Sequence, residues 1–128
     1  METLVVVSKT KKFIKETAGL NTSSAFFEGV SSIVDKTLDA AIENAHKAKR
    51  KTIMGRDFAD FEKAGELKGE ILVVASKVKK LVKDKSGLNT SAQVLPALTL
   101  RVQQACLSAC DQAKSHGRKT VMDRDIAQ

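Results

Sequence analysis

The chain repeats its own sequence after 68 residues, and this duplication restricts the possible folds more than any other feature. Aligned without gaps, residues 4–60 and 72–128 are identical at 23 of 57 positions, whereas chance would give about three. Because 128 residues suit one compact domain, we expect the copies to share one core. The best-matching blocks pair residues 19–23 with 87–91 and residues 50–52 with 118–120.

The repeat predicts how the chain is organised. We expect residues 1–60 to form the first copy, residues 61–70 a linker, and residues 71–128 the second copy, with a shortened third helix. The net charge of +7 divides unevenly among these segments, as +2, −1 and +6. The second copy is therefore the more cationic one.

Composition favours an all-α protein. A single proline and seven glycines disfavour an all-β sandwich with its many tight turns. Trp and Tyr are absent, which argues against a sheet that stacks unpaired bases on exposed aromatic rings.

Each copy is predicted to contain a short, a long and a second short helix. The first helix is amphipathic and is expected to end at Gly19 or Gly87, a residue type common just after helix ends. Its apolar face comprises Val6, Thr10, Phe13 and Ile14 in the first copy, and Val74, Val78, Leu81 and Val82 in the second.

The long helices should begin at the Asn-Thr-Ser segments and end near Lys49 and Ser115. Thr90 and Gln93 have the spacing of a capping box. A helix of about 26 residues is roughly 39 Å long, too long for two short helices to cover, so we expect the two long helices to cross. Pro96 predicts a kink or a later start in the second one. The third helix is expected over residues 55–64 in the first copy.

This order of helices, with Arg-Lys-Thr and an aspartate seven residues after the arginine in both copies, resembles the histone fold. It looks like the tail-less histones of archaea and bacteria. The resemblance implies an antiparallel handshake within one chain, a monomeric pseudo-dimer. It also implies binding of double-stranded DNA without sequence preference, mostly through phosphates, with bending or compaction, and a cytoplasmic, nucleoid-associated location in a prokaryote.

The resemblance also assigns residues. First-helix cations and second-loop Lys-Thr pairs would contact phosphates, and an arginine–aspartate clamp would fix each second loop. Where the family often has a first-loop arginine that enters the minor groove, this sequence has asparagine, which argues against insertion and tight wrapping. The expected DNA contacts are Lys9, Lys12, Lys77, Lys80, Asn21, Asn89, Lys51, Thr52, Lys119 and Thr120, and the clamps are Arg50 with Asp57 and Arg118 with Asp125.

Other interpretations remain open. The lysines could form a merely solvated face, and a histone-fold protein could be a scaffold for other proteins, as transcription-factor subunits are. We expect no enzyme activity, small-molecule substrate, cofactor or metal, because the sequence lacks a nucleophile triad, a Gly-rich phosphate loop and metal-ligand spacing. We expect Cys106 and Cys110 to be reduced residues of the core. The apolar run near the N-terminus is too short to span a membrane.

Overall fold

The computed structural model describes residues 4–58 and 71–126. The short helices are α1 (Val7–Ala18) and α4 (Ala75–Ser86), and each ends where a glycine adopts the left-handed conformation. Gly19 has φ 72° and Gly87 has φ 73°, a conformation that costs other residues energy but not glycine. Buried Thr10 and Ile14 lie on the inner face of α1, as the sequence predicts.

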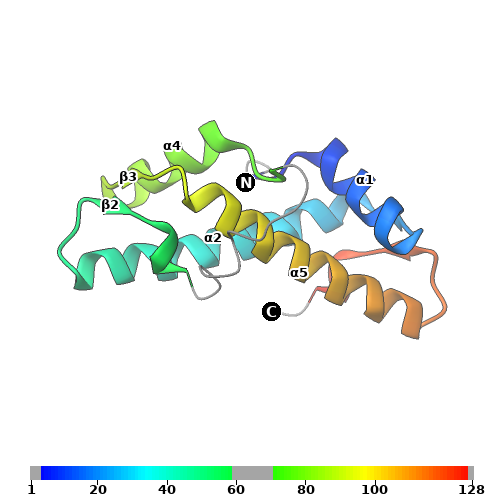
Figure 1. The fold of residues 1–128 in the computed structure, drawn as a ribbon. Coiled ribbons are helices and arrows are strands. Elements are labelled where there is room, and N and C mark those ends of the chain that lie inside the picture. Colours follow the sequence, from blue (N-terminus) through cyan, green and yellow to red (C-terminus); the bar gives the residue numbers. More distant parts are fainter. Residues whose placement is uncertain (1–3, 59–70, 127–128) are drawn as a thin grey trace.

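The long helices are α2 (Ser24–Lys47) and α5 (Val94–Ser115). They cross near their middles, and each short helix packs against the long helix of the other half, α1 on α5 and α4 on α2 (Figure 1). Neither long helix could bury its apolar stripe alone, so the crossing creates the core. Fully buried core side chains include Phe26, Val30, Val34, Leu38, Leu98 and Val102.

Four two-residue strands join the loops of the two halves. Strand β1 (Asn21–Thr22) pairs in parallel with β4 (Thr120–Val121), and β2 (Thr52–Ile53) pairs in parallel with β3 (Asn89–Thr90). Each pair therefore unites the first loop of one half with the second loop of the other.

The segments that precede α1 and α4 also pair with each other. The Val6 amide donates to the Leu72 carbonyl at 2.6 Å, and the Val74 amide donates to the Leu4 carbonyl at 2.8 Å. Buried hydroxyl groups on the long helices accept the remaining hydrogen bonds. The Leu4 backbone amide donates to the Ser31 hydroxyl at 2.9 Å, and the Leu72 backbone amide donates to the Thr99 hydroxyl at 3.1 Å. These equivalent contacts fix both segments on the crossing helices.

The start of α5 differs from the start of α2, and Pro96 accounts for the difference. Helix α2 begins at Ser24, which corresponds to residue 92, so α5 begins two residues later. Pro96 then lies in the first turn, where a backbone N–H has no partner within the helix. Of the two predicted effects of Pro96, a kink or a later start, the structure shows the later start.

The predicted capping box of Thr90 and Gln93 is wrong. Thr90 belongs to β3, and Gln93 is the N-cap residue but makes no side-chain capping bond. The Asn-Thr backbone is used by the strand pair instead. Ser23, the N-cap residue of α2, makes no side-chain capping bond either.

The third helices are single 3₁₀ turns where the structure describes them. These turns are η1 (Gly55–Asp57) and η2 (Asp123–Asp125), and Phe58 after η1 is already extended. The α-helix expected from residue 55 is therefore not formed over residues 55–58. Residues 59–64 and the predicted linker 61–70 lie outside the described residues.

Both cysteines lie on the buried face of α5, as predicted, and neither forms a disulfide. Burial raises the pKa of Cys106 to about 12, with a smaller contribution from Cys110. The thiols therefore serve as small core groups.

Replacing Lys49 by glycine is expected to stabilise the protein by about 0.5–1 kcal/mol. Lys49 follows α2 with φ 57°, whereas the equivalent residue after α5 is Gly117, with φ 69°. Urea unfolding measures the change, and Gly117→Ala is the matched reverse substitution, which should destabilise. Equal stability of Lys49→Gly and wild type would contradict the argument.

Candidate nucleic-acid interface

The β1/β4 corner, defined as residues 21–23 with residues 119–121, brings predicted site residues from both halves together. The Asn21 amide donates to the Lys119 carbonyl at 2.9 Å, and the Ser23 amide donates to the Val121 carbonyl at 2.9 Å. The side chains of Asn21 and Lys119 are exposed, whereas Thr120 is half-buried. The backbone pairing thus presents the Lys119 ammonium and the Asn21 side-chain carboxamide at the same surface.

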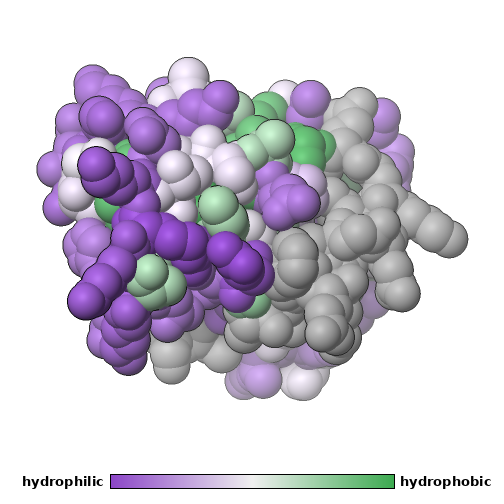
Figure 2. All heavy atoms as spheres, turned by 60° about the vertical axis from the view of Figure 1, so that its left-hand side comes forward, coloured by the Kyte–Doolittle hydropathy of each residue, from purple (hydrophilic) through white to green (hydrophobic). Residues whose placement is uncertain are grey.

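The β2/β3 corner, residues 51–53 with residues 89–91, repeats this arrangement. The Asn89 amide donates to the Lys51 carbonyl at 2.9 Å, and the Ser91 amide donates to the Ile53 carbonyl at 3.1 Å. Lys51 and Asn89 are exposed and Thr52 is half-buried. Figure 2 brings this end of the molecule forward and shows hydrophilic side chains over most of the surface that is not grey.

Helix α2 determines the spacing of the two corners, because it begins just after β1 and ends shortly before β2. Its 24 residues span about 36 Å. One turn of duplex DNA measures about 34–36 Å. The two corners are therefore about as far apart as one helical turn of duplex DNA.

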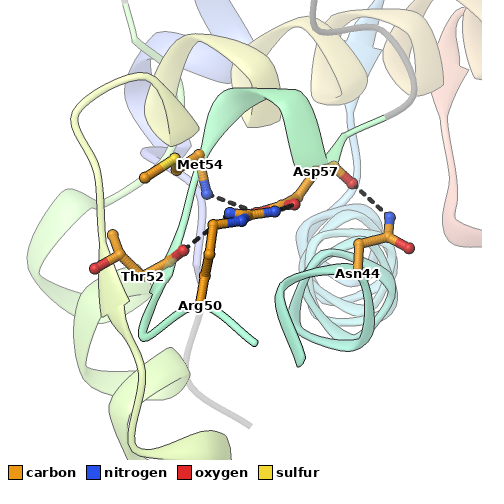
Figure 3. Close-up of polar contacts among 5 residues, drawn as sticks. All are labelled: Asn44, Arg50, Thr52, Met54 and Asp57. Atoms are coloured by element: carbon orange, nitrogen blue, oxygen red, sulfur yellow. Dashed lines mark hydrogen bonds and ion pairs between the residues drawn. The ribbon is translucent and has the colours of Figure 1, made fainter. Parts of the chain in front are cut away.

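The Arg50–Asp57 clamp holds the second loop of the first half, and Figure 3 shows its contacts. Arg50 binds both carboxylate oxygens of Asp57, with Nη1 to Oδ2 at 3.0 Å, and also donates to the Thr52 carbonyl at 3.2 Å. The Met54 amide donates to Asp57 Oδ2 at 2.8 Å. From α2, Asn44 donates to the Asp57 carbonyl at 2.9 Å. The clamp ties the basic loop, η1 and α2 together.

The second half repeats the clamp with Arg118 and Asp125. Nη1 of Arg118 lies 2.7 Å from Oδ2 of Asp125, which also accepts the Met122 amide at 2.8 Å. Hydrogen bonding by Arg118 lowers the pKa of Asp125 against the opposing effect of burial. For Asp57, burial would raise the pKa, but the bonds from Arg50 and Met54 together lower it. Both aspartates thus stay ionised.

The predicted short-helix lysines lie outside the two corners, on α1 and α4, which cover one side of the long helices (Figure 1). Lys9, Lys12 and Lys80 are exposed and Lys77 is half-buried. Lys12 forms an exposed ion pair with Glu16 at 4.0 Å. Exposed pairs of this kind are weak, so Lys12 can still bind an anion.

Lys77 and Lys80 line a hollow of about 370 Å³. Two acids, Asp35 and Asp84, share its wall. The α4 surface is therefore less uniformly cationic than its lysine count indicates.

Sequence reasoning missed Lys15 as a site residue. Its ammonium donates to the Asn21 carboxamide oxygen at 3.4 Å, so it lies at the β1/β4 corner. Lys83 occupies the equivalent place in the last turn of α4. The repetition of lysine at both positions, one turn before each first loop, was the available signal.

Over residues 4–58 and 71–126, no cluster of His, Cys, Asp and Glu could hold a metal ion. The helices found in those ranges are all too short or too polar for a membrane span.

The comparisons with known proteins address the fold. No protein-family model and no curated protein sequence matches the chain. Among solved structures, the histone from Methanopyrus kandleri is similar, with a TM-score of 0.70 and 18% sequence identity. The match covers 94% of this chain and 89% of that chain.

Proposed function

Because the chain has the histone fold, we propose that it binds double-stranded DNA through backbone phosphates, without sequence preference, and bends or compacts it. The observation that carries this proposal is the pair of corners, each of which presents an exposed lysine on a loop joined to the other half. Loop amides, hydroxyls and cations of this kind are typical phosphate ligands. The lysines of α1 and α4 add cations between the corners, and Lys15 adds one at the β1/β4 corner.

The proposal includes the arrangement of the chain. Residues 1–60 and 71–128 act as the two halves of a handshake within one monomer. Two observations support this: both strand pairs in the part of the chain that the structure describes join one half to the other, and the histone match extends over both halves on a single chain. Covalent linkage makes the pairing independent of protein concentration. Such a protein would be associated with the chromosome of its cell.

Spacing and side-chain chemistry indicate how the duplex is held. Corners about one DNA turn apart can contact the same side of the duplex, with α1 and α4 between them. The asparagines at the first loops, in place of long cations, support surface contact rather than deep minor-groove insertion. The expected outcome is a bent duplex, without the tight wrap that inserted arginines support.

The test is a salt series on a duplex of random sequence. If six to ten phosphates are neutralised, the logarithm of the binding constant should fall against that of the salt concentration with a slope of about −5 to −9. Donor and acceptor dyes on the duplex ends report bending in the same titration. A flat salt response, or no binding at low salt, would instead favour a protein–protein scaffold.

A further inference from the structure

A pocket of about 490 Å³ lies where η1 meets the two long helices. Its described walls come from α2, from η1 with the following Phe58, and from the first third of α5. Neither α1, α4 nor the strands of the two corners line it. It is therefore separate from the surface proposed above to contact DNA.

Three cations line this pocket: Lys36 from α2, Arg56 from η1 and Arg101 from α5. Among the described residues, Arg56 and Arg101 form no hydrogen bond or ion pair. The one acid in the described wall is Asp57, whose carboxylate is already bound by Arg50 and the Met54 amide. The pocket thus has two guanidinium groups available for an anion.

The second half shows that the fold does not require this pocket. The repeat places Gln104 where the first half has Lys36, and buried Ile33 where the second has Arg101. At the place in the other half that is equivalent to the pocket, the Ile126 side chain packs directly against Gly29. A Cβ on Gly29 would lie only 2.6 Å from that side chain. The equivalent residue to Gly29 in the open pocket is Ala97. Lys36, Arg101 and the open cavity therefore occur at only one of the two equivalent places, whereas Arg56 has an equivalent cation in Arg124.

We propose that this pocket binds the phosphate group of a small phosphorylated ligand, such as a nucleotide. Guanidinium groups match phosphate oxygens in geometry and charge, and the volume lies in the range of small-molecule sites. Ala40, Phe58 and Ala97 give the ligand an apolar wall. A concave pocket suits a free ligand better than a phosphate on the convex surface of a duplex.

The experiment titrates the ¹⁵N-labelled protein with inorganic tripolyphosphate at 150 mM salt, a concentration on the order of physiological ionic strength. Amide signals of Phe58, Ala97 and Arg101 should shift with saturation. Signals of the equivalent residues Ile126, Gly29 and Ile33 serve as the internal control and should move less. Because the readout is local and no DNA is present, its result does not depend on the proposed function.

Two variants make the test specific. Arg56→Gln with Arg101→Gln should weaken binding at the pocket at least tenfold, whereas Arg124→Gln, at the position equivalent to Arg56, should leave it unchanged. The proposal is overturned if the pocket signals do not shift, or if the shifts survive the double substitution. A separate titration with duplex DNA tests the other source of phosphate: pocket signals that move with duplex but not with tripolyphosphate would refute the small ligand.

Discussion

Replacing Lys51 and Lys119 together by glutamate should weaken binding to a short random duplex at least about a hundredfold at physiological salt. Each substitution removes a cation from one corner and places an anion beside a phosphate. Both side chains are exposed, so folding should be unaffected, and helicity and Tm should stay close to those of the wild type. Fluorescence anisotropy at several salt concentrations measures the loss, and the salt slope should become shallower by about two.

The matched control has the same change in net charge at another place. Lys36→Glu with Arg124→Glu reverses two exposed cations that belong to neither corner. If binding depended only on total charge, both double variants would lose the same affinity. A much smaller loss in the control locates the phosphate contacts at the corners, whereas equal losses would show that this assignment is wrong.

Local patterns in the sequence were sufficient to predict the short first helices and the long helices, but not the 3₁₀ turns found where third helices were expected. Helical periodicity and Gly19 or Gly87 define the short helices, because a core-facing stripe and a left-handed residue act within a few positions. The clamp was predicted from the resemblance to the histone fold, which is carried by Arg50 and Asp57 and by their repeat in the second copy. Its roles in binding Met54 and Thr52 depend on backbone geometry and required the structure.

The corners could not be predicted as joint structures. Each two-residue strand forms only because a loop from the other half lies beside it. The sequence of either loop alone therefore does not predict a strand. The failed capping box has the same cause, since the backbone of Thr90 pairs with β2. An asymmetric contact was also missed: Lys85 of α4 binds Asp35 and Asp39 of α2. Its equivalent, Thr17, faces no such acids, because Gln103 and Leu107 occupy the equivalent places on α5.

Arg118→Ala is expected to lower Tm by about 10 °C, much more than Lys119→Ala at the next residue. The Asp125 side chain is 2% exposed, and without Arg118 its carboxylate would be buried with only the Met122 amide to stabilise it. Lys119 is exposed, so its removal should hardly change Tm. Thermal unfolding followed by circular dichroism measures both shifts, and equal shifts would contradict a structural role for the clamp.

The pH dependence of stability provides a second readout of the same clamp. Because the folded pKa of Asp125 is lowered, its stabilising effect is complete above the unfolded value of about 3.9 and is lost as pH falls through the folded value. Wild-type stability should therefore fall steeply below about pH 4, and Arg118→Ala should show a shallower fall.

DNA binding at a temperature well below Tm should weaken less than tenfold in Arg118→Ala, because Lys119 still presents its charge at the corner. A hundredfold loss would instead make Arg118 a direct DNA contact.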